Sequence, residues 1–485
     1  MAKRNETILP YIEWEFMNKP ITISSVNEHP RLPNGSKKII VTRDEDYNLK
    51  AVLTFNDYNF IFPNPLNEPP AGSFIEYFDI TGSDYLATYL FTLENCHIYS
   101  PKTSSDNEDR ESSMEAKVYI SGFRIKTKLK GDINHLTEWC LNGPYTPVFS
   151  RNTARKLGRS YAKERFEASD KKLESITITN SPSSHAMDYL LINAQDYKFV
   201  VAKVPEQLGP NWSSNIGIEY RTEWGKIPNS TEREEIIELL SFVFGRQLLP
   251  IGYSAYDKDE NLVESYSKNP WGYCAKSYCA KSDFPPIYID IWHKGQAEKT
   301  VSQLLPRYQQ KCEDLHLKEA IWNYWVSQQM PVGTNLTTLS AGVESIIYGW
   351  FNNKSSSNVF LDKDKFENLL QEEIKSIENK LKDYPDGSKI LENILRSNEA
   401  GIMKRYRIFF EEVGLKINDN EWEAINERHV FVHGKALLDK IDWRKVAIHA
   451  QVYEVLFNKI VLKVLGYSGS YIDYTTLGCP EAQLM

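Results

Sequence analysis

The spacing of the hydrophobic residues changes once along this chain, near residue 296, from about two residues to about 3.6. Alternation with a period of two is typical of strands that bury one face, and a period of 3.6 is typical of amphipathic helices. The pattern therefore predicts an α+β protein. We expect a β-rich, sandwich-like N-terminal domain followed by an all-α C-terminal bundle.

The expected strands are rich in Val, Ile, Tyr, Phe and Thr and are separated by Asn, Gly, Pro and Asp. They cover residues 37–43, 48–55, 73–80, 85–93, 116–130, 173–179, 187–204 and 287–293. One helix should interrupt them, because Thr231 and Glu234 have the spacing of a capping box and Gly245 is placed to end a helix.

The expected helices of the C-terminal part have clear hydrophobic faces. They cover residues 298–315, 317–329, 336–351, 363–383, 388–396, 400–413, 419–433 and 443–465. In the last of them, apolar residues spaced by three and four form one seam, as in a helical bundle. We divide the chain into a β-rich domain with a sensor or regulatory role (1–295), a helical connector (296–333) and a bundle (334–485).

Composition limits the classes of function. A chain of 485 residues is too long for one ordinary core, and its net charge of −8 excludes a coat that is basic all over, so any contact with nucleic acid needs a local patch. Six scattered cysteines, no signal-peptide h-region and no apolar stretch near the roughly 20 residues of a membrane span favour a soluble, cytoplasmic protein.

One run near the C-terminus, residues 426–434, carries side chains suited to chemistry: Arg428, His429 and His433, followed by Gly434. Arg428 and His433 lie near the end of an expected helix, at which Gly434 is placed as the left-handed residue. A step of five residues rotates a straight helix by about 140°. The two side chains then point apart unless the helix is bent or ends there, and on a straight helix a site that uses both needs a second copy of the motif.

The spacing Arg-polar-x-x-x-His late in a helical bundle resembles the motif of the HEPN superfamily of ribonucleases. The β-rich half followed by such a bundle resembles the ApeA-like abortive-infection proteins of bacterial anti-phage defence. The resemblance implies a metal-independent endoribonuclease whose two motifs face one cleft of a homodimer. It also implies an RNA substrate, with transfer RNA as a candidate, a phage-derived protein as the trigger, and no cofactor.

The chemistry of RNA explains why these residue types suffice. The 2′-OH of RNA is the nucleophile, so His433 can act as the acid or base at neutral pH. Arg428 can bind two phosphate oxygens as negative charge grows, and His429 can orient His433 or the phosphate. Glu344, on an expected bundle helix, can buttress the site. No metal is required, and if Arg428 faces a cleft, its loss should change stability little.

Other readings of the same residues stay open. Arg444 and His449 repeat the spacing of Arg428 and His433, although a bundle helix with a surface Arg explains them as well. Arg428 can instead pair with a Glu, with the histidines at the negative end of the helix dipole. The protein would then be a non-catalytic sensor or scaffold whose bundle serves only dimerisation or partner binding.

Two further groups of residues could bind ligands. A basic cluster on the helix 400–413, together with a lysine after the motif, could contact the RNA backbone or could simply be solvated. Its members are Lys404, Arg405, Arg407 and Lys435. Cys274 and Cys279 are spaced like half of a zinc site, but no second pair of ligands follows at the spacing of a zinc finger.

Overall fold

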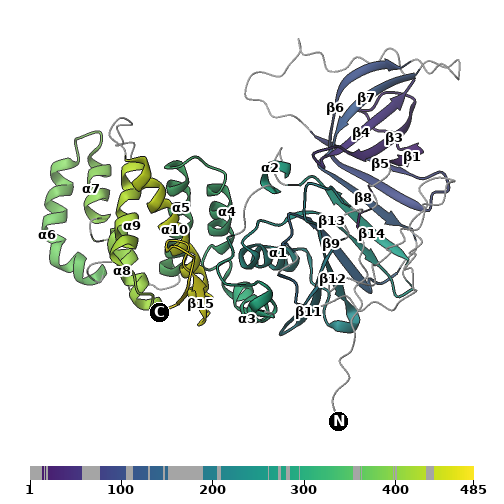
Figure 1. Cartoon of the computed structure of the whole chain (residues 1–485). Helices are drawn as coiled ribbons and strands as arrows, with labels where there is room; N and C mark the ends of the chain where they lie inside the picture. Colours follow the sequence, from purple (N-terminus) through teal and green to yellow (C-terminus); the bar gives the residue numbers. More distant parts are fainter. Residues whose placement is uncertain are drawn as a thin grey trace. The chain divides into compact units, whose positions relative to one another are not determined.

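The computed structural model describes most of the chain as two compact units (Figure 1). It describes residues 14–15, 17, 20–56, 77–104, 113–128, 131–145, 148–150, 189–204, 209–259, 261–270, 275–279, 284–293, 295–352, 361, 363–396, 398, 401–432 and 442–485. The first unit comprises residues 1–284 and 289–302, and the second comprises residues 285–288 and 303–485. The main division therefore falls within the helix α3 (Gln296–Lys311).

The first unit confirms a β-rich N-terminal half. Its strands pair into one antiparallel sheet of 14 strands rather than two separate sheets. The strands are β1 (Ile21–Ile23), β2 (Ser25–Val26), β3 (Ser36–Arg43), β4 (Leu49–Phe55), β5 (Phe78–Ser83), β6 (Tyr89–Ser104), β7 (Ser113–Tyr119), β8 (Gly122–Thr127), β9 (His135–Leu141), β10 (Tyr189–Ala194), β11 (Tyr197–Lys203), β12 (Ile216–Arg221), β13 (Leu249–Tyr256) and β14 (Leu262–Lys268).

The longest of these strands, β6, serves two parts of the sheet. Its C-terminal part, from His97 to Ser104, pairs with β7, and its N-terminal part pairs with both β5 and β8. Side chains from β1 and from β3 to β8 meet in one apolar core, which includes Ile39, Leu53 and Phe91. This part of the sheet therefore encloses its own core.

One helix, α1 (Ser230–Phe244), packs on the sheet, and its start differs from the expected one. The capping box consists of Asn229 and Glu232, not Thr231 and Glu234, whereas Gly245 ends the helix as expected, with φ 63°.

Two of the expected strands are not among the strands that the structure describes. The run 287–293 is not a strand and contains only a short 3-10 helix, η5 (Ile291–His293), and 173–179 lies outside the described residues.

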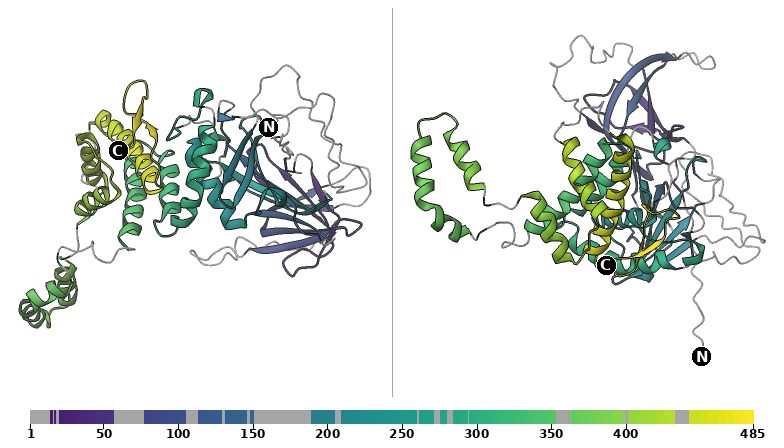
Figure 2. Two further views of the ribbon diagram at one scale, coloured as in Figure 1. Left: turned by 90° about the horizontal axis from the view of Figure 1, so that it is seen from below. Right: turned by 60° about the vertical axis from the view of Figure 1, so that its left-hand side comes forward.

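The second unit is helical, and its helices agree closely with those expected from the sequence (Figure 1; Figure 2). They are α4 (Leu317–Ser327), α5 (Thr334–Asn352), α6 (Lys363–Leu381), α7 (Gly387–Arg396), α8 (Ile402–Val413), α9 (Asp419–Val432) and α10 (Trp443–Val464). A short hairpin, β15 (Ser470–Ile472) and β16 (Glu481–Gln483), follows. None of the helices in the described part of the chain is long and apolar enough to cross a membrane.

The helix α5 contacts α4, α8, α9 and α10 and so occupies the centre of the bundle. Two glycines on α5 allow the close approach of α4 and of the segment before it. A Cβ added at Gly342 would lie 2.9 Å from the Ala320 carbonyl oxygen, and one at Gly349 would lie 2.5 Å from the Asp314 carbonyl oxygen. The segment before α4 therefore packs against the C-terminal part of α5.

Candidate functional site

The helix α9 carries the first half of the predicted motif. It begins with a capping box, in which Asn418 Oδ1 accepts from the Glu421 amide and Glu421 Oε2 accepts from the Asn418 amide, both at 2.9 Å. The backbone of His429 belongs to this helix. His433, Gly434 and Lys435 lie outside the described residues, so the structure does not place the predicted acid or base.

Arg428 is the largest charged side chain in the interior of the bundle, with 2% of its surface exposed. Its Nε and Nη2 donate to Glu344 Oε1 at 2.9 and 2.8 Å, and its Nη1 donates to the Ile425 carbonyl at 2.8 Å. The guanidinium also lies 4.9 Å from the ring centre of Tyr406. This geometry is the Arg–Glu contact that the sequence left open as the alternative to phosphate binding.

The surroundings of Arg428 keep it charged. Burial alone would lower the pKa of Arg428, but Tyr406, Tyr453 and the Glu344 carboxylate outweigh burial and raise the pKa. The hydroxyls of Tyr406 and Tyr453 share a buried hydrogen bond of 2.7 Å, and burial raises both phenol pKa values. The Arg428 cation is therefore surrounded by two neutral phenols and one carboxylate. A catalytic role for Arg428 stays a prediction.

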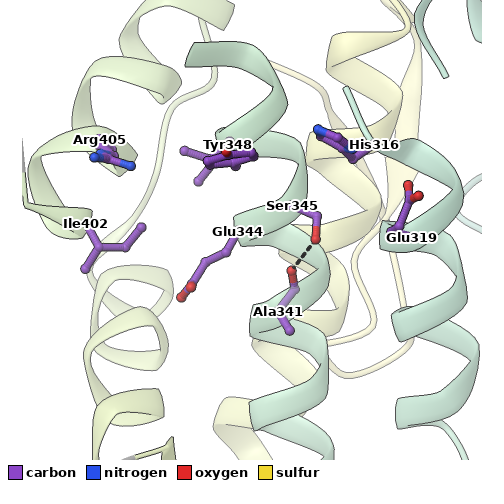
Figure 3. A pocket seen from close by; sticks show the side chains of 9 residues that line it. His316, Glu319, Ala341, Glu344, Ser345, Tyr348, Ile402 and Arg405 are labelled. Atoms are coloured by element: carbon purple, nitrogen blue, oxygen red, sulfur yellow. Dashed lines mark hydrogen bonds between the residues drawn. The ribbon is translucent and has the colours of Figure 1, made fainter. Parts of the chain in front are cut away.

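Glu344 connects this buried cation to the surface. Its side chain is 39% exposed, and it lines a cavity of about 420 Å³ between α5, α8 and the start of α4 (Figure 3). The other lining residues come from α4 and the residue before it, α5 and α8, and they are His316, Glu319, Ala341, Ser345, Ile347, Tyr348, Ile402 and Arg405. The sequence predicts only that Glu344 buttresses the site; the structure pairs it with Arg428, and its supporting role stays a prediction.

His316 has an unusual backbone. It is the residue before α4, and its φ of 50° and ψ of 39° are left-handed, a conformation in which His is found more often than most side chains. Its ring lies against α5, where a Cβ on Gly349 would lie 2.9 Å from His316 Cδ2. The glycine on α5 and the turn before α4 together place the imidazole at the cavity.

The structure separates the members of the predicted basic cluster. Arg405 lines the cavity, whereas the Arg407 guanidinium lies over the ring of Trp422 on α9, 5.8 Å from its centre. Lys404 is partly exposed on α8. Sequence reasoning missed His316 and Tyr348, because nothing in the spacing of the chain relates α4 to α5 and α8.

The competing pair, Arg444 and His449, lies on α10. Arg444 is exposed, and His449 is 4% exposed. The ring nitrogens of His449 lie 3.9 Å from carboxylate oxygens of Glu423 and Glu427 on α9. These contacts join α9 to α10. The exposed Arg444 agrees with the reading of the pair as part of a bundle helix with a surface Arg, whereas His449 is more deeply buried than expected.

No three His, Cys, Asp or Glu side chains within the described ranges are grouped as metal ligands. Cys274 lies outside those ranges, and Cys279 is buried, where burial raises the pKa of its thiol to about 11. Thiolate is the form of cysteine that binds zinc. Cys279 thus favours the neutral, non-ligating form.

Comparisons with family models, with curated proteins and with solved structures gave no match for this chain. The geometry of the bundle and the chemistry of its residues therefore carry the functional argument.

Proposed function

We propose that this chain is a metal-independent endoribonuclease, the effector of an anti-phage abortive-infection system, and that it works as a homodimer with a composite HEPN-type site. Transfer RNA is the candidate substrate. The β-rich unit would sense the trigger, for which we propose a phage-derived protein. The resemblance of the run Arg428 to His433 to the ribonuclease motif is the starting point for this assignment.

The observation that supports it best is the cavity lined by Glu344, which is paired with Arg428 of the motif helix. The pair fixes the end of α9, from which the chain continues to His433, against α5. The same cavity carries an imidazole, His316, and a guanidinium, Arg405. A phosphodiester bond approaching this side of the bundle would therefore meet cationic and proton-transferring groups from α4 and α8 as well as from the motif.

The reaction needs few groups. A base removes the proton of the RNA 2′-OH, and the oxygen attacks the adjacent phosphorus. An acid then donates a proton to the departing 5′-oxygen, which leaves a 2′,3′-cyclic phosphate on one product and a 5′-hydroxyl on the other. His433 is the proposed acid or base. In the described conformation Arg428 positions Glu344 and the end of α9 rather than contacting phosphate.

The purified full-length chain, with EDTA present, should cut single-stranded or looped RNA and leave 2′,3′-cyclic phosphate ends or their hydrolysed form. His433→Ala should lower the rate at least about 10²-fold, the scale for losing an acid or base, without changing the fold. Arg444→Ala, in the competing pair, should cut normally. Activity that is lost with EDTA and restored by magnesium would disprove the proposed chemistry.

One observation favours the second candidate, a non-catalytic sensor or scaffold. Arg428 is 2% exposed and bonded through all three of its nitrogens, which is what a purely structural arginine would show. The two candidates differ in a single readout. If wild-type protein and His433→Ala are equally folded and neither cuts RNA, the scaffold role replaces the nuclease role.

A further inference from the structure

The cavity on α5 has an exposed aromatic ring at its centre. Tyr348 is 55% exposed, and in Figure 3 it lies between Arg405 of α8 on one side and His316 on the other. The ring centres of His316 and Tyr348 are 5.9 Å apart, with the planes tilted by 38°. An aromatic surface beside a guanidinium is an arrangement with which proteins hold single nucleotides, since every base has a face that stacks and the guanidinium can contact a phosphate.

The size and shape of the cavity agree with one nucleotide. Its volume of about 420 Å³ falls within the range of about 300–1,000 Å³ of small-ligand sites. Ile402 and Ala341 supply apolar surface beside the ring, and Ser345 is engaged with its own helix, where its hydroxyl donates to the Ala341 carbonyl at 2.9 Å. The cavity presents to a ligand the ring of Tyr348, the side chains of His316 and Arg405, and the carboxylates of Glu319 and Glu344.

The carboxylates narrow the class of ligand. Glu319 is exposed at one side of the cavity, and Glu344 is partly exposed at the other. Of these two carboxylates, Glu319 would repel a polyphosphate or a continuous track of phosphates, whereas the charge of Glu344 is offset by its ion pair with Arg428. Both carboxylates accept hydrogen bonds from the amino and ring N–H groups along the edge of a base, as carboxylates do in base recognition. One base with one neighbouring phosphate fits this distribution of charge.

We infer that this cavity is a subsite for one unpaired nucleotide of RNA, with the base stacked on Tyr348 and its phosphate at Arg405. The inference rests on the proposed ribonuclease function, because it assigns a place where the substrate is held. It adds Tyr348, Arg405 and His316 as binding residues. It also defines the substrate as a segment with an unstacked base, since a base within a duplex cannot reach the ring.

The test measures binding apart from cleavage. The probe is a fluorescein-labelled, single-stranded RNA decamer that is 2′-O-methylated and so lacks the nucleophilic hydroxyl. Its anisotropy is titrated with the full-length protein. Tyr348→Ala should weaken binding about tenfold, the effect of losing one stacked base, and Tyr348→Trp should restore it. Tyr384→Ala, which removes a Tyr with 66% exposure between α6 and α7, is the matched control and should bind as the wild type does.

Salt dependence tests the phosphate contact. Arg405→Gln should weaken binding and lower the slope of log Kd against log salt by about 0.7, the contribution of one phosphate of a single strand. Arg396→Gln, on α7, where Arg396 forms an exposed pair with Glu392, should leave the slope unchanged. A purely structural role of Arg405 would weaken binding without changing the slope, and that result overturns the assignment.

The outcomes separate this inference from the proposed function. If wild-type protein cuts unmodified RNA while Tyr348→Ala and Arg405→Gln bind the probe like their controls, the subsite is wrong and the nuclease stands. If the protein never cuts RNA but the Tyr348→Ala and Arg405→Gln variants lose binding of the probe, the nuclease function is wrong and the subsite stands. Absence of any binding of the probe to the wild type overturns the subsite, and so does equally tight binding of a duplex of the same length.

Discussion

Arg428 shows how burial changes the meaning of a motif residue. From the sequence, an arginine facing a cleft could be removed at little cost to stability. In the structure its three nitrogens bond to Glu344 and to the Ile425 carbonyl inside the bundle. Loss of the side chain would leave a carboxylate without its partner and a hole above Tyr406, so its contribution to stability and any contribution to cleavage have to be measured separately.

We expect Arg428→Ala to lower the free energy of unfolding by about 2–3 kcal/mol. That is less than the roughly 3–5 kcal/mol of a fully buried pair, because Glu344 is 39% exposed and can be hydrated. Urea denaturation measures it, with the exposed Arg444→Ala expected to stay within about 0.5 kcal/mol of wild type. An Arg428→Ala protein as stable as the wild type would show that the side chain faces solvent.

The left-handed backbone of His316 gives a second prediction about a single residue. His316→Val should cost about 1–2 kcal/mol, since a branched Cβ collides with the carbonyl oxygen in this conformation. His316→Asn should be nearly neutral, because Asn tolerates the left-handed region. Thermal melting of the two variants compares them. Equal loss in both would mean that contacts of the imidazole, rather than the backbone, stabilise this turn.

At the scale of elements, the approach of the segment before α4 to the helix α5 depends on Gly349. An alanine within a helix is normally favoured over glycine by about 1 kcal/mol. Here its Cβ would lie 2.5 Å from the Asp314 carbonyl oxygen and 2.8 Å from Leu315 Cα, both of them backbone atoms. We therefore expect Gly349→Ala to destabilise the chain, by about 1–3 kcal/mol as for other overpacked sites.

The control is Gly401→Ala at the start of α8, where an added Cβ would meet no atom within 4 Å. Because Gly401 is the N-cap of α8 and Gly is favoured over Ala at that position, that change should cost about 0.5–1 kcal/mol. If Gly349→Ala proves as stable as Gly401→Ala in urea denaturation, then the segment before α4 does not contact α5 at this point in solution.

Glu454 on α10 makes the stability of the bundle depend on pH. Burial raises its pKa above the ordinary 4.5, although Gln328 and Tyr324 donate hydrogen bonds to it at 2.7 and 3.3 Å. The folded chain thus favours the protonated form of Glu454 more than the unfolded chain does. Its stabilising effect is complete below pH 4.5 and is lost as the pH rises through the raised pKa.

Glu454→Gln should therefore gain stability relative to wild type as the pH increases from about 4 to 8. Urea denaturation at several pH values follows this difference, and the exposed Glu423→Gln variant on α9 serves as the comparison. A difference between Glu454→Gln and wild type that is constant across this range would show that Glu454 is hydrated in the folded chain.

The helices could be predicted from the sequence to within a few residues, because their signals are local. The capping box of Asn418 and Glu421 and the left-handed Gly414 after α8 each act within one turn.

Several strands could not be predicted from the sequence. All seven residues of β9 are buried, and its Glu138 is neutralised by Arg233 of α1, 95 positions away. The run expected over 116–130 is two strands, since the Ser121 amide bonds to the distant Glu94 carbonyl.

The residues of the candidate site also differ in whether local sequence patterns or long-range contacts determine their positions. The motif is a contiguous run, and the helix α9 and its N-terminal cap follow from patterns of three to five residues. The pairing of Arg428 with Glu344, 84 positions away, does not follow from any such pattern. His316, Tyr348 and Arg405 come from three helical segments and meet only in the folded bundle. No periodicity within one helix encodes that meeting.

At the scale of the whole molecule, the composite site requires two chains. We expect light scattering to give twice the chain mass of 56.1 kDa at micromolar concentration. On dilution below the dissociation constant of the dimer, the rate of RNA cleavage per chain should fall together with the dimer fraction. A monomer that cuts RNA at an undiminished rate per chain would remove the composite site but leave the acid–base chemistry in place.

The order of strands in the sheet also governs how this protein is made. Strand β8 pairs with β14, and β9 lies between β12 and β13, so the middle of the sheet is completed by residues far along the chain. A ribosome that adds about 5–20 residues per second needs roughly 10 s to pass from β8 to β14. During that interval one edge of β8 stays unpaired on the nascent chain. Nascent chains would be most prone to aggregate, and to recruit chaperones, before residue 262 has emerged.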